Sequence, residues 1–167
     1  MAVKVLAFVA KSNTGKTTLL EKVIAELKRR GYKVGVIKHD AHRFDIDHPG
    51  KDSYRLTAAG ADTMVICSQE KLAVVKRHNA APPLEELIPT YFPDMDIVLT
   101  EGFKMSPIPK IEVHRQERSS TLLCRGEQND PNLVAIASDT ELDVDVPVFD
   151  LNDPKGVADF VETTFLT

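Results

Sequence analysis

The chain has 167 residues, of which 43% are hydrophobic and 28% charged, and its formal net charge is −4. This length fits a single domain, 1–167, and the composition excludes a wholly disordered chain. The negative charge gives no electrostatic support for non-specific binding to nucleic acid or to an acidic membrane. No stretch reaches the apolar length of a membrane helix. Two cysteines without a Cys-rich pattern, and no signal peptide, predict a cytoplasmic protein.

An apolar run at residues 3–9 and a helical pattern at residues 16–30 flank a polar turn, AKSNTGKTT, at residues 10–18. A strand, a turn carrying Gly-Lys-Thr and a helix are together typical of a phosphate-binding loop. The N–H groups of such a turn and the helix N-terminus converge on an anion. In this interpretation Lys16 reaches the β- and γ-phosphates of a nucleotide, and the Thr17 hydroxyl lies on the bridging magnesium ion.

Two positions bear on how well this turn fits the usual pattern, G-x-x-x-x-G-K-[ST]. Ala10 stands in place of the first glycine, and alanine fits wherever φ stays negative. Asn13 tolerates the left-handed backbone of such loops better than most residues do. The alternative is an ordinary polar turn capped by Thr14, with Lys16 on a solvated helix face. The strand before the turn and the helix after it favour the phosphate-binding loop.

Gly31 is a natural stop for the first helix, and residues 32–38 follow as a second strand, so the chain begins with a βαβ unit and a parallel sheet. Residues 39–52 then hold three histidines and four aspartates. This segment leaves the carboxyl edge of the predicted sheet, where ligands bind in open α/β folds. It could ligate a transition metal or position magnesium and a phosphate. The alternative is a solvated polar loop, and the position at the ligand edge favours a direct role in handling nucleotide, magnesium or substrate.

The middle of the chain predicts smaller elements. A short helix is expected from Asp52 or Ser53 to Gly60. Residues 62–67 and 72–75 are expected to pair as a hairpin at the edge of the sheet. A further helix at residues 84–88 is expected to be limited by Pro89.

A second motif follows the apolar strand at residues 96–100, which delivers Glu101 at its carboxyl end. Phosphate-loop enzymes place their Walker B acid toward magnesium in this way. Gly102 would allow close approach of the backbone to a phosphate. The alternative is a strand-end acid followed by a turn, and the presence of Lys16 and Thr17 favours the Walker B interpretation.

The last third of the chain predicts two more strands of the sheet. Residues 110–114 alternate polar and apolar, which indicates a strand with one wetter face, and His114 is read as a surface or satisfied histidine rather than a catalytic base. Residues 115–131 are expected to form a mobile excursion. The apolar strand at residues 133–137 ends at Asp139, which could accept the N1–H and exocyclic amine of guanine or simply form a turn.

Residues 146–149 predict a short last strand, and Asp153 is expected to cap a closing helix whose first turn contains Pro154. Taken together, these elements predict an α/β fold of the P-loop NTPase type. Its three-layered architecture would contain a mostly parallel sheet with an antiparallel edge element.

With these stretches identified, the sequence resembles the molybdopterin-guanine dinucleotide biosynthesis protein B (MobB) family. The stretches that carry the likeness are residues 12–18, 38–53, 101–104, 137–139 and 150–153. The resemblance implies a dimeric GTP-binding protein with at most slow GTPase activity that assists attachment of GMP to molybdopterin. It implies the molybdenum cofactor guanylyltransferase as a partner, and molybdopterin itself as a further candidate.

Transferred residue by residue, the resemblance assigns GTP and Mg²⁺ as cofactors. Magnesium falls to Thr17 and Glu101, base recognition to Asp139, and any catalysis to Lys16 and Glu101. The nucleotide-binding residues of the loop are Ser12, Asn13, Thr14, Gly15, Lys16, Thr17 and Thr18. Asn13 stands where the family usually has glycine, and Lys11 where it often has an aromatic residue. Hydrolysis is expected to be slow because the sequence shows no obvious arginine finger, unless Arg43 closes over the site.

Two rival functions fit parts of the pattern. In a small-molecule kinase the loop would hold ATP, and Asp40 or Asp45 would activate an acceptor hydroxyl. In a nucleotide-dependent metallochaperone, His39, His42 and His48 would hold a metal such as zinc or nickel.

Overall fold

The computed structural model describes residues 3–39, 44–126 and 129–167. The chain divides into two units. The first, which we call the core unit, consists of Met1–His39 and Ile88–Thr167, and the second, the hairpin unit, of Asp40–Leu87. No helix within the described ranges is long and apolar enough to span a membrane.

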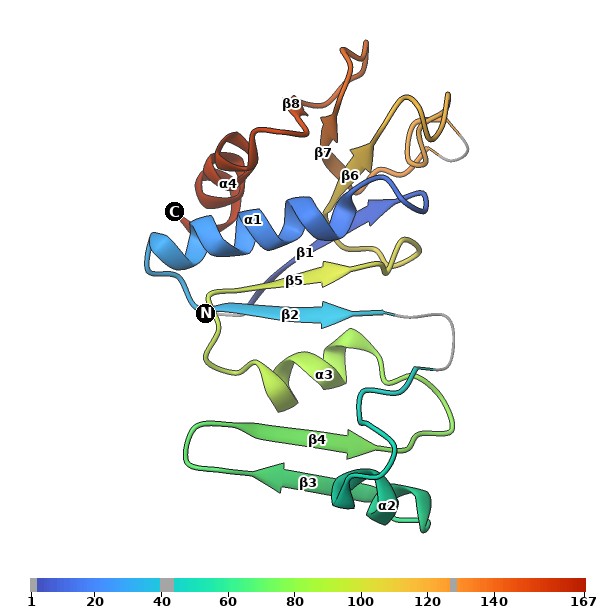
Figure 1. Cartoon of the computed structure of the whole chain (residues 1–167). Helices are drawn as coiled ribbons and strands as arrows, with labels where there is room; N and C mark the ends of the chain where they lie inside the picture. Colours follow the sequence, from blue (N-terminus) through green and yellow to red (C-terminus); the bar gives the residue numbers. More distant parts are fainter. Residues whose placement is uncertain (1–2, 40–43, 127–128) are drawn as a thin grey trace. The chain divides into compact units, whose positions relative to one another are not determined.

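The core unit is built on a six-stranded parallel sheet (Figure 1). Its strands, in spatial order, are β2 (Val34–Lys38), β5 (Ile97–Glu101), β1 (Lys4–Ala10), β6 (Lys110–His114), β7 (Leu133–Ser138) and β8 (Val148–Asp150). The central strand β1 lies between β5 and β6 and is buried from Leu6 to Val9, as an apolar run in a parallel sheet requires. The predicted α/β fold with a mostly parallel sheet is confirmed.

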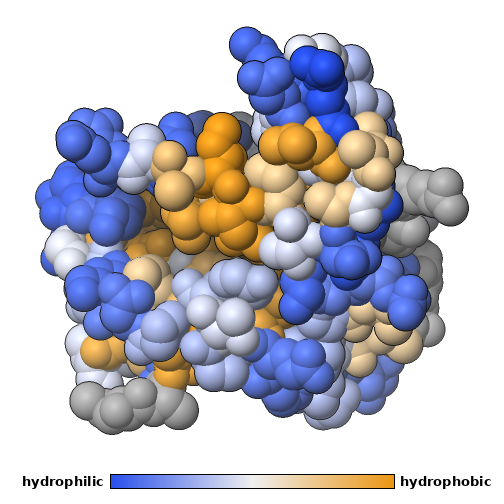
Figure 2. Space-filling view, turned by 90° about the horizontal axis from the view of Figure 1, so that it is seen from below, coloured by the Kyte–Doolittle hydropathy of each residue, from blue (hydrophilic) through white to orange (hydrophobic). Residues whose placement is uncertain are grey.

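The hairpin unit contains α2 (Asp52–Ala58) and an antiparallel pair, β3 (Thr63–Cys67) with β4 (Leu72–Lys76). The pair forms a sheet of its own and does not extend the edge of the parallel sheet as expected. Val65, Ile66 and Leu72 of this pair are large hydrophobic residues that remain exposed. Figure 2 shows hydrophobic residues at the surface in the view that it draws.

The helix α3 (Leu84–Tyr91) leads from the hairpin unit into the core unit. It continues past Pro89, although the sequence predicted that this proline would limit it. Proline removes the hydrogen bond to the carbonyl four residues earlier, here that of Glu85. Because Glu85 is exposed, water can satisfy this carbonyl, so the helix tolerates the proline.

One face of the parallel sheet is covered by α1 (Lys16–Arg29) and α4 (Pro154–Val161), which also contact each other. Gly31, with φ of +94°, ends the first helix, and the Asp153 carboxylate caps α4 by accepting the Gly156 N–H at 3.0 Å, both as predicted. A π-helical turn, Glu162–Leu166, follows α4. The buried cluster on this face includes Phe8, Val23, Leu27, Leu99, Ile111, Val157 and Val161.

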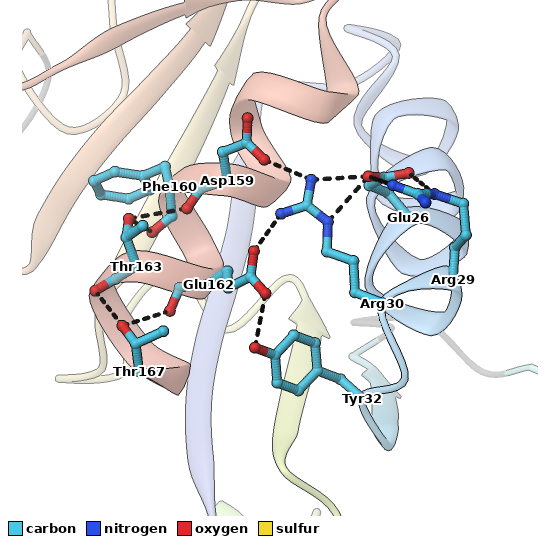
Figure 3. Close-up of polar contacts among 9 residues, drawn as sticks. All are labelled: Glu26, Arg29, Arg30, Tyr32, Asp159, Phe160, Glu162, Thr163 and Thr167. Carbon is cyan, nitrogen blue, oxygen red and sulfur yellow. Dashed lines mark hydrogen bonds and ion pairs between the residues drawn. The ribbon is translucent and has the colours of Figure 1, made fainter.

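Polar contacts hold the ends of these two helices together (Figure 3). Arg30 donates to Glu26 of its own helix at 2.8 Å and pairs with Asp159 and Glu162 from the C-terminal segment. The Tyr32 hydroxyl donates to Glu162 at 2.8 Å. The guanidinium of Arg30 therefore links α4 to the C-terminal end of α1, far from the carboxyl ends of the strands.

The opposite face of the sheet carries a second buried cluster, which includes Ala7, Val9 and Ile136. There the sheet packs against the segment that follows β6 rather than against a helix. Leu122, Leu123 and Cys124 of this segment are buried. β6 has no wetter face: Glu112 is 2% exposed and accepts the N–H groups of Leu123 and Cys124 at 2.6 and 2.8 Å. The predicted mobile excursion is thus, in its described part, a segment anchored to the sheet.

Lys110 and His114, the other polar residues of β6, are also buried. The ammonium of Lys110 pairs with Asp130 at 2.8 Å and donates to the Ser106 carbonyl at 2.6 Å. The alternation of polar and apolar residues therefore reflects buried polar partners here and not exposure to water.

Candidate functional site

The carboxyl ends of the six parallel strands meet at one edge of the core sheet, and the predicted site residues of this unit lie there. The polar loop after β1 leads into α1, Glu101 closes β5, and Asp139 follows β7. Ligands bind at this edge in open α/β sheets because loops and helix N-termini face it. The fold therefore gathers residues that lie more than a hundred positions apart in the sequence.

The loop after β1 has the backbone that its sequence predicts. Asn13 has φ of +60° and Gly15 φ of +91°, so two residues adopt the left-handed conformation that asparagine and glycine tolerate. Thr14 does not cap the helix: its hydroxyl donates to the Lys11 carbonyl at 3.2 Å, and Gly15 occupies the N-cap position. Thr14 is therefore not the helix cap that the alternative of an ordinary polar turn assumed.

Three predicted residues come together where this loop meets β5. The Thr17 hydroxyl donates to both oxygens of the Glu101 carboxylate, at 3.2 and 3.1 Å. The Lys16 ammonium lies 3.5 Å from the same carboxylate, which is only 12% exposed. The register of β1 on β5, which pairs Phe8 with Glu101, brings the acid to the start of α1.

A hydroxyl and a carboxylate oxygen within hydrogen-bond distance are hard donors of the type that Mg²⁺ prefers, so the chemistry of Thr17 and Glu101 fits that ion. Ser12 and Thr18, also assigned to the nucleotide, are exposed. Among the described residues, no group of three or more His, Cys, Asp or Glu side chains is arranged to hold a metal by itself. Any ion here would share its coordination with a ligand or with water.

One residue that the sequence did not single out, Lys38, also approaches Glu101, and His39 lies next to the following residues. The Lys38 ammonium, at the end of the neighbouring strand β2, lies 3.9 Å from the Glu101 carboxylate. Gly102 has φ of +102°, and the His39 Cβ would lie 3.3 Å from a Cβ added there. The His39 ring rests on Phe103, with centroids 4.8 Å apart. The parallel pairing of Lys38 with Glu101 is the signal that could have identified this lysine.

Asp139 is less free than predicted. One of its oxygens accepts the Gln116 N–H at 2.8 Å, and the other lies 3.7 Å from Arg115 Nη1. Asp139 also lines a cavity of about 550 Å³ at the carboxyl ends of β7 and β8. Its remaining lining residues include Ser138, Thr140, Glu141, Phe149, Asp150 and Asn152. Several oxygen-bearing side chains thus line a space large enough for a nucleobase.

Arg115 is the second residue that the sequence analysis missed. Its Nε donates to the Thr14 carbonyl at 3.3 Å, and its side chain is 31% exposed. The pairing of Ala10 with Val113 in the β1–β6 register places Arg115, two residues further on, beside the phosphate loop. Only this pairing of two strands, which no local motif reveals, brings the arginine to the loop.

The remaining candidates belong to the hairpin unit or to parts of the chain that are not described. Asp45 and His48 lie in the hairpin unit, where both are exposed. Asp40, His42 and Arg43 lie outside the described residues. The kinase and metallochaperone hypotheses that depend on them stay predictions.

Comparison with known proteins gives consistent matches. The family model for "Molybdopterin guanine dinucleotide synthesis protein B" (MobB) matches residues 5–139. A molybdopterin-guanine dinucleotide biosynthesis adapter protein of Escherichia coli K12 is 41% identical over 95% of this chain and 91% of its own length. The protein of the same name from Haemophilus influenzae is 37% identical over 96% of this chain and 88% of its own.

Solved structures agree with these relatives. The crystal structure of a molybdopterin-guanine biosynthesis protein B superposes with a TM-score of 0.77 at 27% identity, covering 95% of this chain and 98% of the other. A crystal structure of Bacillus subtilis MobB also gives 0.77, at 28% identity, covering 97% and 98%. The relatives and solved structures cover nearly the whole chain, the family model covers residues 5–139, and the chain belongs to the MobB family.

Proposed function

We propose that this protein binds GTP with Mg²⁺ and acts as an adapter in molybdopterin guanine dinucleotide biosynthesis, where it assists attachment of GMP to molybdopterin. Its relatives are named as adapter proteins of that biosynthesis. The observation that carries the proposal is the meeting of Lys16, Thr17 and Glu101 at the start of α1. These are the groups that a phosphate loop and its partner acid need in order to bind a nucleotide.

In this proposal the backbone amides of the loop and the N-terminus of α1 receive the phosphates. Lys16 neutralises phosphate charge, and the oxygens of Thr17 and Glu101 would hold the magnesium ion, which supplies charge neutralisation when bound. Lys38 adds a second cation at the same place. The base would enter the cavity beside β7 and β8, where Asp139 supplies an acceptor that suits the N1–H and amine of guanine.

Turnover would be slow. Glu101 is engaged by Thr17 and two lysines, so it is a ligand and charge partner rather than a free base. The guanidinium of Arg115 lies on a loop carbonyl and so is not supplied to the phosphates in this arrangement. In such a protein the binding of the nucleotide, rather than its hydrolysis, carries the function. This suits an adapter whose partner is the guanylyltransferase.

The test is calorimetric titration of the protein with GTP and with ATP, each with magnesium. We expect GTP to bind more tightly than ATP, and Lys16→Ala to abolish binding while the circular dichroism spectrum is unchanged. Lys22→Ala is the matched control, because Lys22 is exposed on the same helix and lies one and a half turns from the loop. Unchanged GTP affinity in Lys16→Ala would refute the site, and a preference for ATP would favour a kinase.

We propose further that the protein is a homodimer and that the hairpin unit forms the contact. Val65 and Val74 are cross-strand partners, and Leu72 lies on the same face of the pair. Their exposed fractions are 53%, 37% and 64%. A two-stranded sheet with an uncovered apolar face is marginally stable in water by itself, so burial against a second copy would stabilise it.

Light scattering on a size-exclusion column tests this contact. The wild-type protein should elute with the mass of two chains, and Val65→Glu should shift it toward the mass of one. Thr63→Glu, on the same face but at a polar exposed position, is the control. A wild-type protein that stays monomeric at about 100 μM, or a Val65→Glu variant that stays dimeric, would contradict the proposed contact.

A further inference from the structure

We propose that Arg115 is a positioning residue of the phosphate loop: it fixes the peptide between Thr14 and Gly15 so that the Gly15 N–H faces the phosphates. The inference rests on the proposed function, because it names the residue that shapes the same nucleotide site. It starts from the contact between Arg115 Nε and the Thr14 carbonyl, at 3.3 Å.

The argument depends on the planarity of the peptide group. In a trans peptide the carbonyl of one residue and the N–H of the next point in opposite directions. A donor that holds the Thr14 carbonyl on one side of the loop therefore directs the Gly15 N–H to the other side. Arg115 Nη2 also covers Gly15, at 3.5 Å from the position of an added Cβ. The guanidinium therefore contacts the loop both at the Thr14 carbonyl and at Gly15.

Left without such a partner, this peptide could rotate, because glycine populates many backbone conformations. Turning this peptide over changes ψ of Thr14 and φ of Gly15 together, and glycine accepts both the observed φ of +91° and a negative φ at low cost. A charged donor makes a stronger hydrogen bond to a carbonyl than a neutral one does. Arg115 thus orders the loop before a phosphate binds, which lowers the entropic cost of binding.

Arg115 is itself held in place from both sides. The Asp139 carboxylate lies 3.7 Å from its Nη1 and accepts the N–H of the following residue, Gln116, at 2.8 Å. Further along the same segment, the Ser119 and Thr121 hydroxyls each accept from the Lys11 ammonium at 2.8 Å. The segment after β6 therefore contacts the phosphate loop through Arg115 and again through Ser119 and Thr121. Asp139, which contacts Arg115, also lines the cavity at the carboxyl ends of β7 and β8.

The experiment compares the wild-type protein with Arg115→Ala in titrations with GTP and with inorganic tripolyphosphate, each with magnesium. Tripolyphosphate has no base, so it reports on the loop alone. We expect Arg115→Ala to weaken both ligands about tenfold, which corresponds to about 1.4 kcal/mol. Arg118→Ala is the matched control, because Arg118 lies in the same segment and pairs with Glu117 instead. It should leave both affinities unchanged.

A second measurement separates positioning from a loss of folded structure. In the free protein, the Gly15 amide resonance should shift and broaden in Arg115→Ala, whereas amides of α4 stay where they are. Wild-type affinities together with an unmoved Gly15 resonance would overturn the proposal. A loss of GTP affinity alone, with tripolyphosphate unaffected, would also overturn it, because Arg115 would then act on the base.

The outcome for Arg115 is distinguishable from that for the proposed function. If the wild-type protein bound ATP as tightly as GTP, the proposed guanine preference would fail. The tripolyphosphate comparison between wild type and Arg115→Ala would still decide the role of the arginine. Lys16→Ala, measured in the same series, shows whether tripolyphosphate occupies the phosphate loop, since it should then lose that ligand.

Discussion

Removing the carboxylate of Glu112 should destabilise the protein strongly. Glu112 is 2% exposed and accepts two buried N–H groups, those of Leu123 and Cys124. Glu112→Ala would leave both donors without a partner, and each buried unsatisfied donor costs about 1–3 kcal/mol. The expected loss in the free energy of unfolding is therefore about 2–6 kcal/mol, a large part of the stability of an ordinary domain.

Two further variants define this prediction. Glu112→Gln keeps one acceptor oxygen and should cost about half as much, about 1–3 kcal/mol. Glu117→Ala is the control, because its side chain is 67% exposed and its contact with Arg118 spans 3.7 Å; we expect a change within about 0.5 kcal/mol. Urea unfolding followed by circular dichroism measures all three. A loss below about 1 kcal/mol in Glu112→Ala would refute the view that this carboxylate anchors the segment.

Two further predictions concern titratable groups. Hydrogen bonds from Arg29 and then Arg30 lower the pKa of Glu26 from its usual 4.5 to about 2, so its stabilising contribution is present above pH about 4.5 and lost as the pH falls toward 2. The difference in unfolding free energy between wild type and Arg29→Gln, followed by urea unfolding, should therefore shrink over that range; a constant difference would contradict it. Burial, and then the nearby Glu112 carboxylate, raise the pKa of the Cys124 thiol to about 12. Iodoacetamide at pH 8, followed by mass spectrometry, should therefore label Cys124 only in urea. Labelling of Cys124 in the folded protein would contradict this prediction.

The elements of the core could be predicted from the sequence because their signals are local. Apolar runs gave the strands, and the helical spacing and Gly31 gave the first helix with its end. The meeting of Lys16 with Glu101 was also foreseeable, since a phosphate loop and a strand-end acid occur together in one fold family. These inferences need no knowledge of which distant residues pair.

What the sequence could not reveal depends on such pairing. Glu112 looks like an exposed residue of an alternating strand until the segment that carries its donors, eleven and twelve residues later, is placed on top of it. Arg115 looks like part of a polar loop until the register of β6 on β1 places it beside Thr14. A polar side chain can be buried only where hydrogen-bond partners meet it, and the tertiary structure decides where those partners lie.

Glu112 and Arg115, which the sequence analysis missed, act on the same segment of the chain. Glu112 holds the segment after β6 to the sheet, and Arg115, at the start of that segment, holds the phosphate loop. A variant that frees the segment should then weaken nucleotide binding even under conditions where most molecules stay folded, because Arg115 and the Ser119 contact with Lys11 would lose their fixed geometry. The stability of the sheet and the shape of the nucleotide site are thus coupled through the segment after β6, whose described residues form no helix and no named strand.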